Sequence, residues 1–185
     1  MIKEVTAQIN EALKTLFDKY PGKKIYGITQ PMERTQGTET EIIPCEIDSN
    51  GEGTYVGIDD TAPLIVYHKL GNAVASTPPP VRSGYGDGEY SVNTFSGAMI
   101  VYFDRKVVTL MPDELFFYIQ GALPTQIKLS PFKNIRILFQ NVILNSQAVY
   151  QSEYQNGQTL DPGKSMIAIN YQIESTFSKD CFATC

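Results

Sequence analysis

Residues 164–178 alternate between apolar and polar side chains with a period of two. One side carries Ile167, Ile169, Tyr171, Ile173 and Phe177, and the other carries Ala168, Asn170, Gln172, Glu174 and Thr176. Successive side chains of a β-strand point to opposite faces, so this pattern predicts a strand with one dry and one wet face. Because the run is much longer than the usual strand of about five residues, it requires a sheet with an apolar layer over one face.

A second long strand is predicted over residues 134–154, which read NIRILFQNVILNSQAVYQSEY. The segment between the two runs, residues 155–163, is rich in Asn, Gly, Asp and Pro, which favour turns. We therefore expect the two strands to pair as a long antiparallel hairpin near the C-terminus.

Two helices are predicted from apolar residues at helical spacing. The first begins near residue 2 and is ended by Tyr-Pro-Gly at 20–22, and the second spans 109–124, with Pro112 in its first turn. The apolar stripe of the first comprises Ile2, Val5, Ile9, Leu13 and Leu16, and that of the second Leu115, Phe116, Ile119 and Leu123.

Between the helices the sequence predicts strands. Residues 98–103 are apolar on both alternating faces, which indicates a central strand covered on both sides. Shorter strands are expected at about 24–30, 39–47, 54–58 and 63–70, with turns near 31–37, 48–53 and 59–60.

The order of elements lacks the regular βαβ alternation of a doubly wound fold. We expect an α+β fold: a mostly antiparallel β-sheet with two flanking helices, a long inserted loop and a long C-terminal β-hairpin. The chain, residues 1–185, is expected to be a single domain with a projecting loop at about 72–95.

Charge and hydropathy exclude several classes of protein. The formal net charge is −5 and the longest basic run is Lys23-Lys24, so a surface that binds nucleic acid tightly is not expected. No 18-residue apolar stretch or signal-peptide core is present, which predicts a protein without a membrane span that stays in the cytoplasm. Three scattered cysteines, Cys45, Cys181 and Cys185, are too few for a disulfide framework.

No motif of a known reaction or cofactor site is complete. His68, the one histidine, lies within a predicted strand, where a structural or surface role is expected, and the three cysteines lack zinc-site spacing. The glycines of GYGDGEY (84–90) precede a strand rather than a helix and lack the lysine of a phosphate-binding loop. We therefore expect no catalytic residue, no cofactor and no metal.

The segment 76–92, STPPPVRSGYGDGEYSV, interrupts an otherwise strand-like region. Three prolines stiffen its first limb and three glycines loosen its tip, which is typical of an arm that contacts another subunit. The wet face of 164–178 is uncharged apart from one glutamate, which suits a hydrogen-bonded contact. The predicted subunit-contact residues are Pro79, Arg82, Tyr85, Tyr90, Asn170, Gln172 and Glu174.

Three stretches resemble the tail-terminator and neck (head-to-tail joining) proteins of tailed bacteriophages. They are VTAQINEALKTLFDKYPGKKIYG (5–27), MIVYFDRKVVTLMPDELFFYIQGAL (99–123) and MIAINYQIESTFSKDCF (166–182). The last two look like small virion proteins of phages that infect Bacteroides-type bacteria.

This resemblance implies a virion structural protein, assembled in the host cytoplasm, that forms a homo-oligomeric ring of six or twelve subunits. The ring would join or terminate the tail beside neighbouring neck, portal or tail-tube proteins. DNA would pass through its lumen without specific binding, in agreement with the net charge of −5.

Two other functions stay open. The 76–92 loop could form the platform of a carbohydrate or small-ligand binding module through Tyr85 and Tyr90. An enzyme using paired carboxylates, with Asp59-Asp60 or Asp87 and Glu89 as the nearest pairs, predicts a pocket in which such groups converge.

Overall fold

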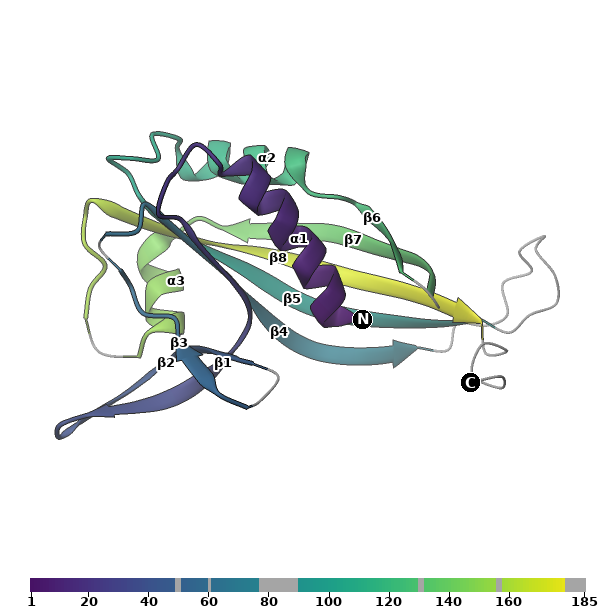
Figure 1. The fold of residues 1–185 in the computed structure, drawn as a ribbon, viewed down its shortest axis with the longest axis horizontal. Coiled ribbons are helices and arrows are strands. Elements are labelled where there is room, and N and C mark those ends of the chain that lie inside the picture. Colours follow the sequence, from purple (N-terminus) through teal and green to yellow (C-terminus); the bar gives the residue numbers. More distant parts are fainter. Residues whose placement is uncertain (49–50, 60, 77–89, 130–131, 156–157, 179–185) are drawn as a thin grey trace.

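The computed structural model describes residues 1–48, 51–59, 61–76, 90–129, 132–155 and 158–178 (Figure 1). These residues form an α+β fold in which one eight-stranded sheet carries helices on both faces. The helices are α1 (Ile2–Leu16), α2 (Pro112–Ala122) and α3 (Ser146–Glu153). The strands are β1 (Lys24–Gln36), β2 (Glu39–Ile47), β3 (Gly53–Tyr55), β4 (Leu64–Ser76), β5 (Tyr90–Asp104), β6 (Gln126–Leu129), β7 (Phe132–Ile143) and β8 (Lys164–Ser178).

The sheet is antiparallel except at one place. Its strand order is β3-β2-β1-β4-β5-β8-β7-β6, and only the contact between β1 and β4 is parallel. The central pair, β5 and β8, stays in register from Tyr90 opposite Ser178 to Asp104 opposite Lys164. In Figure 1, β4, β5 and β8 continue past the N-terminal end of α1, so part of the sheet extends beyond its helices.

The larger part of the core lies between the sheet and the pair α1 and α2. Val5, Ile9 and Leu13 of α1 are buried there, as the helical spacing predicts, together with Leu115 and Ile119 of α2. The sheet supplies the buried side chains Leu64, Val66, Met99, Val101, Phe103, Ile135, Ile137, Ile167, Ile169, Tyr171 and Ile173. The dry face of β8 is therefore the one that the sequence predicts. The predicted wet face is not wet throughout, because Ala168 is buried in the core under α3.

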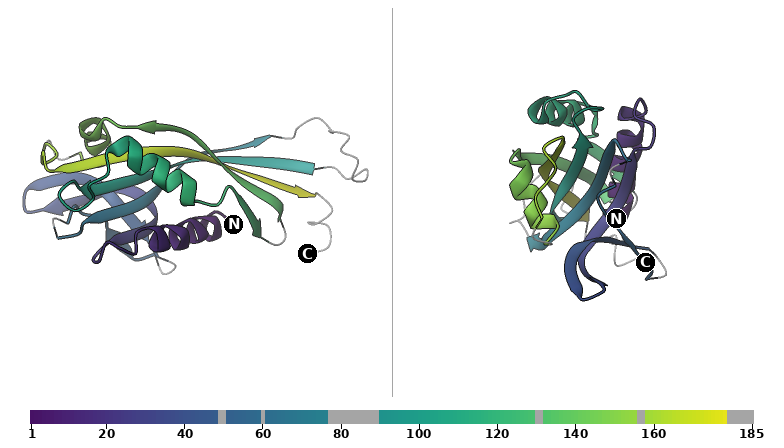
Figure 2. Two further views of the ribbon diagram at one scale, coloured as in Figure 1. Left: turned by 90° about the horizontal axis from the view of Figure 1, so that it is seen from above. Right: turned by 90° about the vertical axis from the view of Figure 1, so that its left-hand side faces the viewer.

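A smaller core fills the opposite face of the sheet, under α3 (Figure 2). Val149 and Tyr150 of α3 pack there against Tyr67, Ile100 and Tyr102 of the central strands. Both faces of β5 are thus covered between Met99 and Phe103, which confirms the central strand predicted from its double apolar pattern.

The prediction of one long strand over residues 134–154 is wrong. The strand β7 ends at Ile143, and α3 begins at Ser146, so three helices flank the sheet rather than two. The Asn145 side chain caps the helix by accepting a hydrogen bond from the Ala148 backbone N–H at 3.1 Å. β7 and β8 pair antiparallel as predicted, although α3 lies in the connection between them.

Two boundaries also differ from the sequence analysis. The expected turn at 31–37 is mostly strand, because Pro31 continues β1 opposite Pro44 of β2, and the turn itself lies at Gly37, with φ of 66°. The expected loop at 72–95 is partly strand, since β4 runs to Ser76 and β5 starts at Tyr90. The residues between them, 77–89, lie outside the described part of the chain.

None of the described helices is long and apolar enough to cross a membrane.

A close contact across β5 and β8 predicts the first mutational effect. A Cβ added at Gly97 would lie 2.9 Å from two carbons of the Tyr171 ring and 3.0 Å from the Lys69 carbonyl oxygen. Gly97→Ala should therefore lower the free energy of unfolding by about 1–3 kcal/mol, because the crowded ring must shift. Urea unfolding monitored by circular dichroism measures this.

The matched control is Gly121→Ala. A Cβ at Gly121 in α2 meets nothing within 4 Å, and alanine favours a helix over glycine by up to about 1 kcal/mol, so this variant should be as stable as the wild type or slightly more stable. A Gly97→Ala protein with an unchanged unfolding midpoint would contradict the described packing of Tyr171.

Candidate functional site

The predicted contact residues of β8 lie together on the face of the sheet that carries α3, in the part that this helix leaves uncovered. Asn170, Gln172 and Glu174 are half-buried on this face. The strand register places Glu174 between Thr94 of β5 and Arg136 of β7, Gln172 between Ser96 and Leu138, and Asn170 between Ala98 and Asn141. We call this surface the polar face; it comprises Thr94, Ser96, Arg136, Gln140, Asn141, Asn170, Gln172 and Glu174.

Side-chain amides on the polar face bond to one another. Gln140 donates through Nε2 to Oε1 of Gln172 at 2.9 Å, and Asn170 donates through Nδ2 to Oδ1 of Asn141 at 2.9 Å. An amide carries two donor hydrogens and an oxygen with two acceptor sites, so each pair keeps capacity for further hydrogen bonds. The internal pairs hold these side chains in place, which lowers the entropy lost when they contact another molecule.

The other predicted contact residues belong to the 76–92 segment. Pro79, Arg82 and Tyr85 lie outside the described residues, as does the side chain of Tyr90, whose backbone begins β5. The structure thus brings together the three predicted residues of β8 and does not test the four of the loop.

A groove of about 330 Å³ adjoins the polar face where α3 ends. It shares Ser96 and Asn170 with that face. Small residues line much of it, namely Gly71, Gly97, Ala98 and Ala168, and Leu70 and Ile143 beside them are 39% and 42% exposed. We call it the small-residue groove; a hollow with this lining suits an apolar side chain.

An ion pair lies in the same groove. Nζ of Lys69 is 2.7 Å from Oε1 of Glu153, whose side chain is only 4% exposed. Tyr67 donates through its hydroxyl to Oε2 at 3.3 Å. The Ser152 hydroxyl lies 3.1 Å from Oε1, but its one proton is shared with the Val149 carbonyl oxygen, which is closer at 2.8 Å. The buried carboxylate is therefore compensated mainly by Lys69 and Tyr67. Burial raises the pKa of the Tyr67 hydroxyl.

The buried side chain of His68 in β4 is the middle member of a chain of hydrogen bonds. Its Nε2 is 2.9 Å from Oδ1 of Asn10 in α1, and its Nδ1 is 3.2 Å from the hydroxyl of Tyr171. Because Nδ2 of Asn10 donates to the Tyr26 carbonyl oxygen at 3.0 Å, Oδ1 faces the imidazole and accepts the Nε2–H. Nδ1 is then the acceptor of the Tyr171 hydroxyl, which makes His68 a neutral imidazole.

This arrangement serves the fold rather than catalysis. The side chain of His68 has no solvent exposure, and burial lowers its pKa to about 4. Its partners come from α1 and β8, so the chain of bonds ties those elements to β4. Of the two roles expected for the histidine, structural and surface, the burial and these contacts support the structural one.

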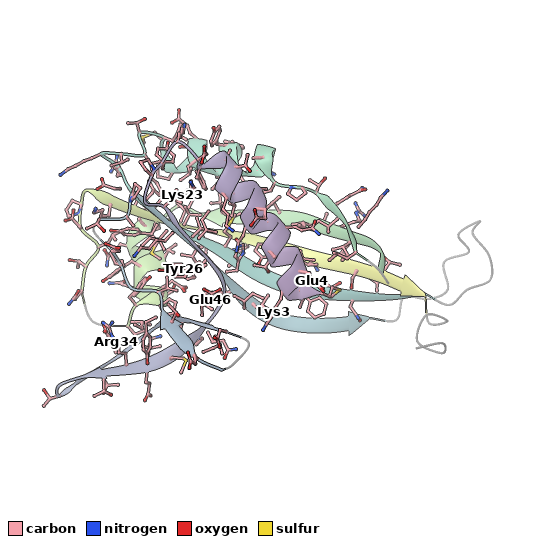
Figure 3. The ribbon with its side chains drawn as sticks, in the orientation of Figure 1. Lys3, Glu4, Lys23, Tyr26, Arg34 and Glu46 are labelled. Atoms are coloured by element: carbon pink, nitrogen blue, oxygen red, sulfur yellow. The ribbon has the colours of Figure 1, made fainter. Side chains whose placement is uncertain are left out.

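Two further hollows lie away from the polar face. One, of about 410 Å³, lies between α1 and the strands β1 and β2, with Lys3 and Glu46 in its lining (Figure 3). The other, of about 570 Å³, lies between the β1–β2 hairpin and α3, beside the ion pair of Arg34 and Glu41. In neither hollow do the described residues combine a nucleophile with a base and an orienting acid.

Metal ligands do not gather in the described part of the chain. No group of three or more His, Cys, Asp or Glu side chains lies close enough there to hold a metal ion. Cys45 is a buried free thiol whose pKa is raised by that burial, and Cys181 and Cys185 lie outside the described residues.

Sequence reasoning found three of the eight residues of the polar face and missed the other five. The alternation in β8 identified Asn170, Gln172 and Glu174. The sequence analysis does not identify their neighbours in β7, including Gln140 and Asn141, because it treats residues 134–154 as one strand. The bulge between Phe139 and Asn141 also shifts the register, which sequence alternation does not reveal. The Asn-Ser dipeptide at 145–146, a helix-capping signal, could have corrected this.

Compared with models of known protein families and with curated proteins, the sequence matches none.

His68 predicts a pH dependence of stability. The unfolded chain takes up a proton on this side chain near its ordinary pKa of 6.5, whereas the folded protein resists protonation until about pH 4. Stability should therefore be complete above pH 6.5 and fall by about 3 kcal/mol as the pH drops from 6.5 to 4. Urea unfolding across this range measures the loss.

The variant His68→Gln supplies the control. It should be less stable at neutral pH but should lose the additional dependence between pH 6.5 and 4. The carboxylates with lowered pKa values, Asp59 and Asp104, have an ordinary value of 3.8, so their loss of stability falls mainly below that window. An equal slope in the variant and the wild type would contradict a neutral, buried His68.

Proposed function

We propose that this chain is a virion structural protein that assembles into a homo-oligomeric ring in the neck or tail of a phage. The ring joins or terminates the tail around the DNA channel, in contact with neck, portal or tail-tube proteins. It acts by assembly rather than by catalysis. The basis for the phage assignment is the resemblance of three sequence stretches to neck and tail-terminator proteins.

The observation that carries an assembly function is the polar face. Four strands of 12 to 15 residues, β4, β5, β7 and β8, build a sheet that is longer than the helices covering it. On one face of these long strands, Ile135, Ile137 and Ile173 belong to the main core. The other face presents ordered amides and hydroxyls with few charges, which suits a specific contact better than a surface that serves only solubility.

The charge of the chain supports passage of DNA through the ring. Its formal net charge is −5, so the phosphate backbone would be repelled rather than held by an assembly of many copies. A protein that surrounds moving DNA needs this property, because clustered basic side chains would retain the nucleic acid.

Native mass spectrometry and negative-stain microscopy of the purified protein test the proposal. The expected result is a closed ring of six or twelve subunits. A strict monomer at high concentration, without rings in the images, would contradict it.

A matched pair of variants tests the polar face as the subunit contact. Gln140→Arg adds a charge beside Gln172 and should weaken self-association by about tenfold or more, because an unpaired charge is costly in a contact. Gln8→Arg makes the same change at an exposed position of α1 and should leave association unchanged. Sedimentation velocity across a concentration series measures both; equal effects would remove the polar face from the interface.

A further inference from the structure

The aromatic side chain of Phe117 on α2 lies exposed on the surface of the described part of the chain. Leu115 and Ile119 face the core, and with 3.6 residues per turn Phe117, between them, faces outward. Its side chain is 65% exposed, and Met111 at the start of the same helix is 52% exposed. Gly121, one turn further along, has open space at its Cβ position, so the approach to Phe117 is unobstructed from that side.

The small-residue groove has the shape and polarity to receive such a side chain. Gly71, Ala98 and Ala168 leave a hollow of about 330 Å³, with the exposed apolar side chains of Leu70 and Ile143 beside it. Lys69 and Glu153 compensate each other, so entry of an apolar ring leaves no unpaired charge.

The groove is continuous with the polar face, because Ser96 and Asn170 belong to both. Together they have the anatomy of a subunit interface, with an apolar centre beside polar side chains that can hydrogen-bond across the contact. Aromatic side chains that enter such a centre contribute much of the binding energy.

The two features lie on opposite faces of the sheet. Phe117 belongs to α2, which packs on the face of the main core, whereas the groove lies on the face that carries α3 (Figure 2). One copy can therefore present its α2 to a second copy while its groove receives α2 of a third. Such a head-to-tail contact generates rings when the rotation between copies closes.

We propose that Phe117 of one copy inserts into the small-residue groove of the next, forming the repeating contact of the assembly. The contact is heterologous: α2, with Phe117 and Met111, is the donor half, and the groove with its polar face is the acceptor half. Asp113, one turn before Phe117, then approaches the half-exposed Lys69 with the opposite charge. This inference rests on the proposed ring assembly and deepens it.

Single variants test each half. Phe117→Ala should weaken self-association by about tenfold or more, whereas Tyr118→Ala, an aromatic neighbour on the same helix, should change it by less than about threefold. Ser96→Arg places a long charged side chain at an exposed position of the groove and should weaken association as strongly as Phe117→Ala. Asn170→Arg is a second block of the groove, used if Ser96→Arg does not fold by circular dichroism.

Mixing the two variants distinguishes this contact from others. The Phe117→Ala protein keeps an intact groove, and the Ser96→Arg protein keeps an intact Phe117, so an equimolar mixture can form one good contact and no second one. Native mass spectrometry should show monomers for each variant alone and a 1:1 heterodimer for the mixture. A mixture that stays monomeric would overturn the head-to-tail contact.

The remaining outcomes separate this inference from the proposed function. If the wild type forms rings and both single variants form them equally well, the Phe117 contact is wrong and ring assembly stands. If the wild type is a strict monomer at every concentration, the proposed function and this contact both fall.

Discussion

The hydroxyl of Tyr171 and the ring that carries it hold four elements of the fold in one arrangement. The ring of this β8 residue lies over Gly97 of β5, where a methyl group would collide with it. Its hydroxyl bonds to His68 of β4, and His68 bonds to Asn10 of α1. A buried polar group without a partner is costly, so each member of this chain fixes the position of the next. The helix α1 cannot shift along the sheet without leaving Nε2 of the imidazole without its partner Asn10.

The unequal covering of the two sheet faces follows from this anchoring. With α1 tied to β4 through Asn10 and packed against β1 and α2, the main core occupies one face along most of the sheet. The short helix α3 covers the opposite face only in part. What it leaves open is the polar face and the small-residue groove, which are therefore products of one short helix on long strands. An asymmetric molecule of this kind suits head-to-tail assembly, in which each copy presents different surfaces to its two neighbours.

Several elements were predictable because their patterns are local. The stripe of Val5, Ile9 and Leu13 gave α1, and the strict alternation around Ile169 and Tyr171 gave β8 with the correct faces. The division of residues 134–154 into β7 and α3 was not predictable in this way. An apolar run followed by mixed residues shows no hydrophobic periodicity that separates a strand from a short helix. The sequence places Pro31 in a turn, yet it continues β1. The Pro44 carbonyl points outward to the Val56 N–H, so Pro31 opposite it also directs its missing N–H away from β2, where proline is tolerated.

The sequence by itself determined the α+β class, the antiparallel character of the sheet, the buried faces of α1 and β8, and the polar character of Asn170, Gln172 and Glu174. Periodicity decides these properties, because it depends only on which neighbouring residues share a side of a helix or strand. The tertiary structure alone decided that Asn10, His68 and Tyr171 form one chain of bonds, and that Gly71, Ala98, Ile143 and Glu153 line one groove. The chain of bonds joins three elements and the groove joins four. Their meeting depends on strand order and register, which no local pattern encodes.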